Sequence, residues 1–366
     1  MKFGVAKKNK KILVFYNKKN IEIHPLWLRE RVTNPELLDR NNGQRLYEPS
    51  ELKNNLKIKE ALIKKNSLKV KFSDGVESKY YINDIVKEFN KSKNKKIILW
   101  DNNIKRIPSF KFHIKMFEKK LGLNFMKSFY KFGFAIAKKT PNKKNFIIKF
   151  ANLIGSVRST NFGILFNVKS VRKATDLAYT SHALSAHTDN PYRMPIPGIQ
   201  LLHCIKNDSV GGHSTLTDGF KVAEYIRKKY PKMFKILTSV KLRFTYMDKN
   251  NYLENWGKII ELDENDKIKR IRLSPRLDYV PILSKDKLSK FYKARTLFIT
   301  LCNSKRFMIE FKLKPGDLLV MDNYRTLHGR TSYNMSIGER HLQGCYIDHD
   351  SAGSKLKLLE IKEQRL

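Results

Sequence analysis

Residues 184–192 read Leu184-Ser185-Ala186-His187-Thr188-Asp189-Asn190-Pro191-Tyr192. On an extended strand, side chains two positions apart project from the same face, so His187 and Asp189 can point toward one place. A second histidine, His328, lies in the distant segment 322–330, directly after an apolar run that is typical of a strand. The sequence therefore offers two imidazoles and one carboxylate that neighbouring strands could bring together.

Two imidazoles and one carboxylate form the ligand set of non-haem Fe(II) sites, which leave coordination positions open for a cosubstrate and O2. No cysteine lies beside them, which argues against a structural zinc site. Arg340 follows His328 by twelve residues, enough chain for a hairpin to return its guanidinium to the metal. A guanidinium can hold a distant carboxylate by a two-point hydrogen-bonded pair, as a metal-bound 2-oxo acid requires. A single His-x-Asp pair also arises by chance; the combination with His328 and Arg340 is what makes the signal specific.

The segments around these residues predict a mainly β fold with inserted helices. After about residue 160, many short apolar strands are separated by turns, among them 199–205, 318–321 and 342–347. Asp218 is a good N-cap for one helix, and a longer helix is expected near 285–302. Many short strands with few helices favour a jelly-roll, or double-stranded β-helix, over a parallel sheet.

The N-terminal part of the chain predicts a separate module. Residues 1–90 form a small β-rich N-terminal domain in this interpretation, with strand patterns at 68–72 and 77–82. The basic run 91–96 would link it to a catalytic jelly-roll domain at 97–366.

Composition excludes several classes of protein. The chain has 366 residues, 41% of them hydrophobic, enough for two domains with apolar cores. Three cysteines are too few for a disulfide framework, which favours a reducing, cytoplasmic setting. No run reaches the roughly 18 apolar residues that a membrane span needs, so no membrane is expected as a partner.

The net charge of +40 comes from 74 Lys and Arg against 34 Asp and Glu. The lysines are spread along the whole chain. Neither zinc-finger spacing, nor an RNA-binding aromatic strand, nor a Gly-rich phosphate loop accompanies them. We interpret the charge as a solvated basic surface without a specific nucleic-acid partner, and attraction to polyanions is the alternative.

In the segments around His187 and His328, the chain resembles the γ-butyrobetaine hydroxylase and trimethyllysine dioxygenase branch of the Fe(II)/2-oxoglutarate dioxygenases. This superfamily also includes taurine dioxygenase. The resemblance covers most of the chain and is strongest over 179–220 and 314–346. It implies a double-stranded β-helix with three iron ligands and one 2-oxoglutarate anchor, with O2 as the second cosubstrate and ascorbate as a stimulant. The motifs that carry it are His187-Thr188-Asp189-Asn190-Pro191-Tyr192-Arg193, Pro197-Gly198-Ile199-Gln200-Leu201-Leu202-His203-Cys204 and Gly211-Gly212. The ligands it implies are His187, Asp189 and His328, and the anchor is Arg340.

The family binds a trimethylammonium group in an aromatic cage, because ring faces attract a desolvated cation. The positions that match this cage are Phe162, Phe166, Tyr179 and Tyr346. Phe replaces Tyr or Trp at two of them, which weakens the cation–π attraction. Without the resemblance, these rings would be interpreted as ordinary core residues.

The chain departs from the family in two respects. The animal enzymes carry a zinc site, built largely from cysteines, in their N-terminal module, whereas all three cysteines here lie in the catalytic region. The asparagines that hold the substrate carboxylate in the family are not clearly retained. Asp176 stands near one of them, as in trimethyllysine dioxygenase, and Arg276 follows the other. Arg276 or Arg193 would instead bind a carboxylate or a phosphonate.

The resemblance thus implies a hydroxylase of the carnitine-biosynthesis type that oxidises an unactivated C–H bond of a small zwitterion. A γ-butyrobetaine-like substrate is expected first, with trimethyllysine or trimethylaminoethylphosphonate as alternatives. A basic polyanion-binding protein on a degenerate oxygenase fold is the alternative from another class. A homodimer formed through the N-terminal module is compatible with the sequence.

Overall fold

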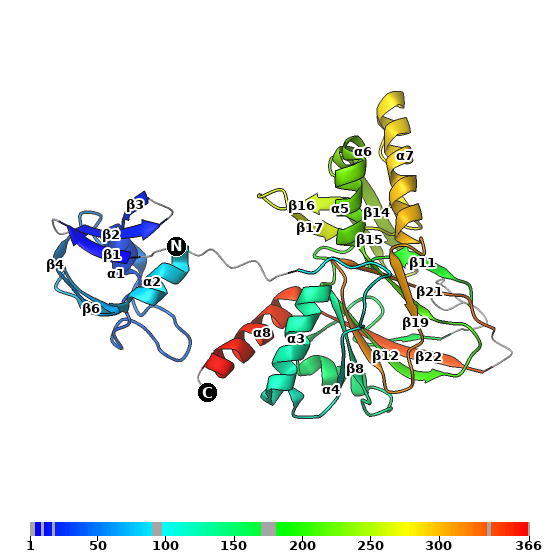
Figure 1. Cartoon of the computed structure of the whole chain (residues 1–366), viewed down its shortest axis with the longest axis horizontal. Helices are drawn as coiled ribbons and strands as arrows, with labels where there is room; N and C mark the ends of the chain where they lie inside the picture. Colours follow the sequence, from blue (N-terminus) through cyan, green and yellow to red (C-terminus); the bar gives the residue numbers. More distant parts are fainter. Residues whose placement is uncertain are drawn as a thin grey trace. The chain divides into compact units, whose positions relative to one another are not determined.

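The computed structural model describes residues 4–8, 11–16, 19–89, 97–169, 181–334 and 338–364. The chain divides into two compact units, 1–94 and 95–366. Figure 1 shows the first unit in blue to cyan and the second from cyan through green and yellow to red.

Two small antiparallel sheets form the first unit. One sheet contains β1 (Gly4–Lys8), β2 (Lys11–Tyr16) and β3 (Lys19–Glu22), and the other contains β4 (Ile58–Lys64), β5 (Ser67–Phe72) and β6 (Glu77–Tyr81). Leu68, Val70 and Phe72 alternate with more exposed residues along β5, so one face of this sheet builds the core. The helical segments of the unit are α1 (Pro25–Arg29), η1 (Pro49–Glu51) and α2 (Ile82–Phe89).

Two mainly antiparallel sheets pack face to face in the second unit. The larger has the order β10-β22-β12-β20-β8-β7, with β9 also paired to β22, and the smaller has the order β11-β21-β13-β19. The strands of the larger sheet are β7 (Ser109–Lys111), β8 (Phe134–Lys138), β9 (Val157–Arg158), β10 (Phe166–Val168), β12 (Ile199–Asn207), β20 (Leu318–Asp322) and β22 (Arg340–Ile347). Those of the smaller sheet are β11 (Leu184–His187), β13 (Ser214–Asp218), β19 (Met308–Phe311) and β21 (Thr326–Arg330).

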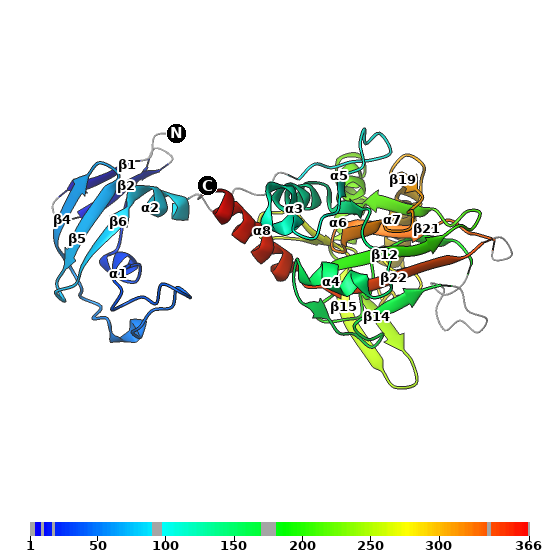
Figure 2. The same ribbon diagram turned by 90° about the horizontal axis from the view of Figure 1, so that it is seen from below.

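Each face of the larger sheet has its own core. In β8, Phe134 and Ile136 pack toward residues of the smaller sheet, whereas Ala135 and Ala137 belong to the cluster on the opposite face. Helices cover that second face, as Figure 2 shows. They are η2 (Met116–Glu118), α3 (Lys120–Phe132), α4 (Phe146–Asn152) and α8 (His349–Gln364).

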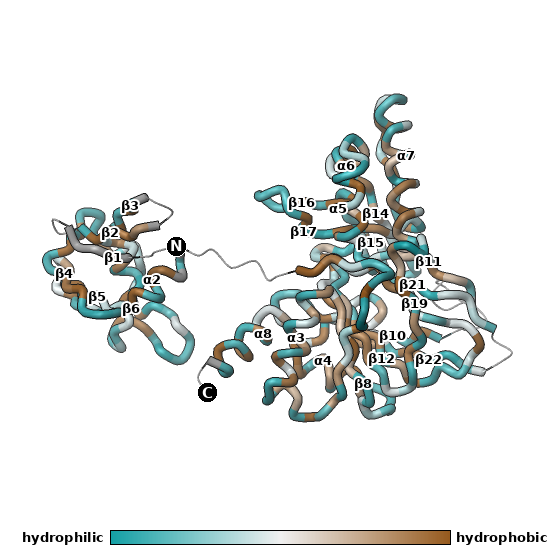
Figure 3. The backbone as a smooth tube through the Cα atoms, in the orientation of Figure 1, coloured by the Kyte–Doolittle hydropathy of each residue, from teal (hydrophilic) through white to brown (hydrophobic). Residues whose placement is uncertain are grey.

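A third layer of helices and short strands is inserted in the chain between β13 and β19 of the smaller sheet. Its long helix α7 buries Phe291, Ala294, Phe298 and Cys302, a spacing of three or four residues that places all four on one face. Figure 3 shows the corresponding alternation of hydrophobic and hydrophilic residues along α7. The helices of this layer are α5 (Gly219–Lys229), α6 (Pro231–Leu237) and α7 (Lys285–Cys302); its strands are β14 (Lys241–Met247), β15 (Tyr252–Lys258), β16 (Ile260–Leu262), β17 (Ile268–Ile271) and β18 (Asp278–Tyr279).

The predicted mainly β jelly-roll with inserted helices is confirmed. The helix expected near 285–302 is present as α7, and Asp218 caps α5 by accepting hydrogen bonds from the backbone of Phe220 and Lys221. The hairpin of β14 and β15 and the C-terminal helix α8 were not predicted. Among the described residues, no helix is both long enough and apolar enough to cross a bilayer.

Candidate metal centre and adjoining cavities

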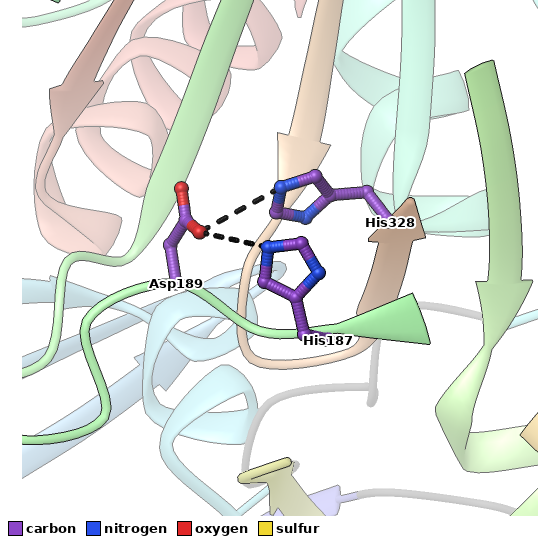
Figure 4. Close-up of side chains that lie close together, drawn as sticks. All are labelled: His187, Asp189 and His328. Carbon is purple, nitrogen blue, oxygen red and sulfur yellow. Dashed lines mark ion pairs between the residues drawn. The ribbon is translucent and has the colours of Figure 1, made fainter. Parts of the chain in front are cut away.

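Strands β11 and β21 bring the two histidines of the sequence motif together. They are antiparallel neighbours, and His187 lies directly opposite His328. The imidazole centroids are 4.3 Å apart. Asp189 follows β11 by two residues, and Figure 4 shows its carboxylate pointing toward both rings. One ligand atom from each of the three residues lies within 4.8 Å of the others.

The protonation states of Asp189 and His328 allow both side chains to bind a cation. Asp189 Oδ1 lies 3.4 Å from Nε2 of His187 and 3.6 Å from Nε2 of His328. Burial alone would raise the pKa of Asp189, but the two histidines and its hydrogen bonds hold it well below the usual range, so the carboxylate is ionised. Burial lowers the pKa of His328 to about 4, which keeps that imidazole neutral.

The tautomer of His187 is set by its backbone. Its Nδ1 lies 2.8 Å from the carbonyl oxygen of Ser185, and this oxygen can only accept a hydrogen bond. Nδ1 therefore carries a proton, which leaves Nε2 as the nitrogen that faces Asp189 and a metal ion. Two imidazole nitrogens and one carboxylate oxygen converge at this point, which is the donor set that Fe(II) oxygenase sites use.

Several hydrogen bonds fix Asp189 itself. The side chain of Asn323 accepts from the Asp189 backbone N–H at 2.8 Å and donates to the Asp189 carbonyl at 3.0 Å. Gln200 and Tyr346 donate to Asp189 Oδ2 at 2.5 and 2.6 Å. Burial and the charge of Asp189 raise the pKa of Tyr346 well above its ordinary value. These contacts hold the carboxylate of Asp189 in one orientation.

A cavity of about 580 Å³ connects the three residues with Arg340. The Arg340 side chain is buried, and its Nε donates to the carbonyl of Gly212 at 3.2 Å. Its Nη1 has no partner among the described residues. Burial, followed by the charge of Arg330, lowers the pKa of Arg340 to about 10, so the group stays cationic at neutral pH. A buried cation with an unpaired N–H favours an anionic ligand, because an unpaired buried charge is costly.

A second cavity of about 650 Å³ adjoins His187 and Asp189 and has aromatic walls. Phe166 stacks on Tyr346 with ring centroids 5.2 Å apart, and Phe162 meets Tyr246 edge to face at 5.5 Å. Among the described residues that line this cavity, Arg276 is the only cation. Phe166, His187 and Asp189 line both cavities, so the candidate metal centre stands at their junction.

Most of the site residues expected from the sequence meet in these two cavities. The exception among the described residues is Arg193, which lines neither cavity and donates to Asn161 instead. Asp176 and Tyr179 lie outside the described residues. The residues that meet are His187, Asp189, His328, Arg340, Phe162, Phe166, Arg276 and Tyr346.

Sequence reasoning missed four contributors to the site. Tyr192 and Tyr246 stack on each other with centroids 5.1 Å apart and widen the aromatic wall. Gln200 and Asn323 position Asp189. Gln200 gave a usable signal, because it is a polar amide within the apolar run 199–202. Tyr246 gave none, because it comes from the unpredicted hairpin.

Comparison with known proteins agrees with this geometry. Residues 112–346 match the family described as "Taurine catabolism dioxygenase TauD, TfdA family". The γ-butyrobetaine dioxygenase of Pseudomonas sp. (strain AK-1) is 35% identical over 220 residues, which cover 60% of this chain and 57% of that protein. The mitochondrial trimethyllysine dioxygenase of Homo sapiens is 30% identical over 357 residues, which cover 92% and 82%. The chain therefore spans under three fifths of the first relative and most of the second.

Two solved structures share the fold of about two thirds of the chain. An asparagine oxygenase in complex with Fe(II), 2S,3S-3-hydroxyasparagine and succinate superposes with a TM-score of 0.51 at 14% identity, covering 63% of this chain and 79% of that one. The non-haem iron oxygenase OrfP, in complex with Fe and α-ketoglutaric acid, gives a TM-score of 0.50 at 14% identity, covering 66% and 94%. At this identity the likeness establishes the fold alone.

Proposed function

Since the chain belongs to the TauD/TfdA family of dioxygenases, we propose that it is an Fe(II)- and 2-oxoglutarate-dependent hydroxylase of a small trimethylammonium zwitterion. One observation carries the proposal. The His187, Asp189 and His328 group stands where a cavity containing a buried guanidinium meets a cavity with aromatic walls. Such a junction brings an acidic cosubstrate and a quaternary ammonium substrate to one metal ion.

His187, Asp189 and His328 would hold Fe(II), and Arg340 would hold the far carboxylate of 2-oxoglutarate. When bound, the iron would supply O2 activation coupled to oxidation of 2-oxoglutarate to succinate and CO2, with hydroxylation of a substrate C–H bond. The protein's part is to bind and orient. Arg340 fixes the cosubstrate at the end remote from the metal, and the apolar lining excludes bulk water from the reacting groups.

The aromatic cavity favours a substrate with a cation at one end and an acid at the other. Phe162, Phe166 and Tyr346 offer ring faces to a trimethylammonium group, which is weakly hydrated and cannot donate hydrogen bonds. Arg276 lines the same cavity and would bind a carboxylate or phosphonate. This pairing favours γ-butyrobetaine, and trimethylaminoethylphosphonate has the same arrangement of charges. Trimethyllysine carries an additional amino group.

The test is succinate formation from 2-oxoglutarate and Fe(II) in the presence of separate candidate substrates. γ-Butyrobetaine should stimulate turnover most, ahead of trimethyllysine and trimethylaminoethylphosphonate. The matched control is 4-aminobutyrate, which keeps the chain length and the carboxylate but lacks the methyl groups, and it should stimulate little. Slow uncoupled turnover with none of the quaternary amines stimulating it would exclude the trimethylammonium assignment and leave the dioxygenase assignment standing. Iron-independent, steeply salt-dependent binding of polyanions would favour the alternative class of function.

A further inference from the structure

Tyr346 is the residue at which the aromatic cavity and the candidate metal centre meet. It lies in β22 and is 4% exposed. Its ring stacks on Phe166, with an angle of 29° between the ring planes, and both rings line the aromatic cavity. Gly344 precedes it by two residues on the same strand, and a Cβ there would overlap the Phe166 ring. The backbone therefore makes room for this ring pair.

The hydroxyl of Tyr346 has a different partner from its ring. It donates to Asp189 Oδ2 at 2.6 Å. Gln200 lies directly opposite Tyr346 in the pairing of β12 with β22 and donates to the same oxygen at 2.5 Å. A carboxylate oxygen only accepts hydrogen bonds, so the amide of Gln200 must present its NH2 to Asp189. Two adjacent strands of the larger sheet thus hold one oxygen of a residue that lies just after β11 of the smaller sheet.

This arrangement leaves the other oxygen of Asp189 for the cation. Oδ1 is the atom that faces Nε2 of both histidines, at 3.4 and 3.6 Å. A carboxylate with Oδ2 engaged by two donors is presented as a ligand through Oδ1 alone. Hydrogen-bond partners behind a metal ligand commonly change metal affinity by roughly 10- to 100-fold.

We propose that Tyr346 is a positioning residue for Asp189, with Gln200 as its partner, in addition to being a wall of the substrate cavity. The proposal rests on the proposed function only for the identity of the ion and of the substrate. A cation bound against the Tyr346 ring contacts the side chain that orients the metal's carboxylate. Metal binding and occupancy of the cavity are then linked, and each changes the affinity for the other by the same factor.

The test is a titration of the full-length protein with Co(II), followed by the visible absorption of the bound ion. Tyr346→Phe keeps the ring and removes the hydroxyl, and it should weaken Co(II) binding by about 10- to 100-fold. Gln200→Met should weaken it similarly. Tyr324→Phe is the matched control, because the Tyr324 hydroxyl donates to the Ile196 carbonyl and the residue lines neither cavity. Its Co(II) affinity should equal that of the wild type.

A Co(II) affinity of folded Tyr346→Phe within twofold of the wild type would overturn the proposal. If that variant fails to fold, Gln200→Met decides by the same criterion. Tetramethylammonium then separates this proposal from the substrate assignment: it should alter the Co(II) affinity of the wild type and alter that of Tyr346→Phe less. Weakened Co(II) binding in Tyr346→Phe, with no effect of tetramethylammonium on the wild type, would support the positioning role and count against the aromatic cage.

Discussion

Arg325 and Asp218 form a buried two-point ion pair. Nε and Nη2 of Arg325 donate to the two carboxylate oxygens of Asp218 at 3.0 and 2.7 Å, and the side chains are 2% and 0% exposed. Arg325 also donates to the backbone carbonyls of Ile98 and Lys131. The pair joins the end of β13 to the start of β21, three residues before His328. It therefore supports the strand that carries one candidate ligand.

Asp218→Asn should destabilise the protein by about 3–5 kcal/mol, because it leaves the buried guanidinium of Arg325 without a counter-charge. Urea denaturation followed by far-UV circular dichroism measures the change. Asp286→Asn is the control: it removes an exposed ion pair with Lys290 and should cause no measurable change. Equal stability of Asp218→Asn and the wild type would contradict the role assigned to the pair.

His187→Ala should abolish Fe(II) binding, since it removes one of three converging ligands. Equilibrium dialysis with Fe(II) under anaerobic conditions measures this. His203→Ala removes a buried histidine on β12 that lies outside both cavities, so it should retain the metal even if the variant is less stable. Loss of Fe(II) from both variants to the same extent would mean that His187 has no specific role.

Arg340→Met should raise the KM for 2-oxoglutarate by about 100-fold, as expected for loss of a buried charged hydrogen bond of roughly 3 kcal/mol. The control cosubstrate is 2-oxobutyrate, which lacks the far carboxylate. The wild type and Arg340→Met should use it equally poorly. Arg340→Lys should recover little, because an ammonium lacks the planar two-point geometry. An unchanged KM for 2-oxoglutarate would place its far carboxylate elsewhere.

Arg276→Gln should raise the KM for γ-butyrobetaine by tenfold or more, because the substrate acid loses its cationic partner. The KM for 2-oxoglutarate should stay unchanged, since Arg276 lines the aromatic cavity and Arg340 the other. Arg193→Gln is the matched control and should change neither constant, because Arg193 lines neither cavity. A raised KM for γ-butyrobetaine in Arg193→Gln, with an unchanged value in Arg276→Gln, would assign the binding of the substrate acid to Arg193 instead.

Acid should destabilise the fold through His203. Burial lowers the pKa of this residue to about 4 from 6.5, and its Nδ1 has no partner among the described residues. The unfolded chain therefore binds a proton between these two pH values that the folded chain does not. The free energy of unfolding is therefore highest above about pH 6.5. It falls by about 3 kcal/mol as the pH drops toward 4. His203→Gln should reduce this pH dependence of the unfolding free energy; an identical dependence in both proteins would exclude His203 as its source.

The metal triad and Arg340 could be predicted from the sequence because each half of the site has a local spacing. His187 and Asp189 are two residues apart, and Arg340 follows His328 within one hairpin. Short-range spacing of this kind is preserved whenever the segments form strands. The aromatic wall could be predicted only in part. Tyr246 joins it from β14, and no local sequence pattern connects that strand with the cavity.

The missed helix α8 has a physical reason. Its apolar residues are not confined to one helical face, because Leu358 and Ile361 lie away from the face of Leu356, and Gly353 lies inside it, where glycine disfavours a helix. Ala352, Leu356 and Leu359 are nevertheless buried in one cluster with residues of α3, α4 and the larger sheet. Packing, which no single segment reveals, therefore decides the conformation here.

His187 and His328 are direct neighbours in space although 140 residues separate them in the sequence. An ion bound to both would act as a cross-link that closes this long loop, and such closure stabilises the folded chain most when the loop is long. Binding that occurs only in the folded state also adds stability as the free ion concentration rises above its dissociation constant. The supply of metal would then govern how long the chain resists proteolysis as well as how fast it turns over.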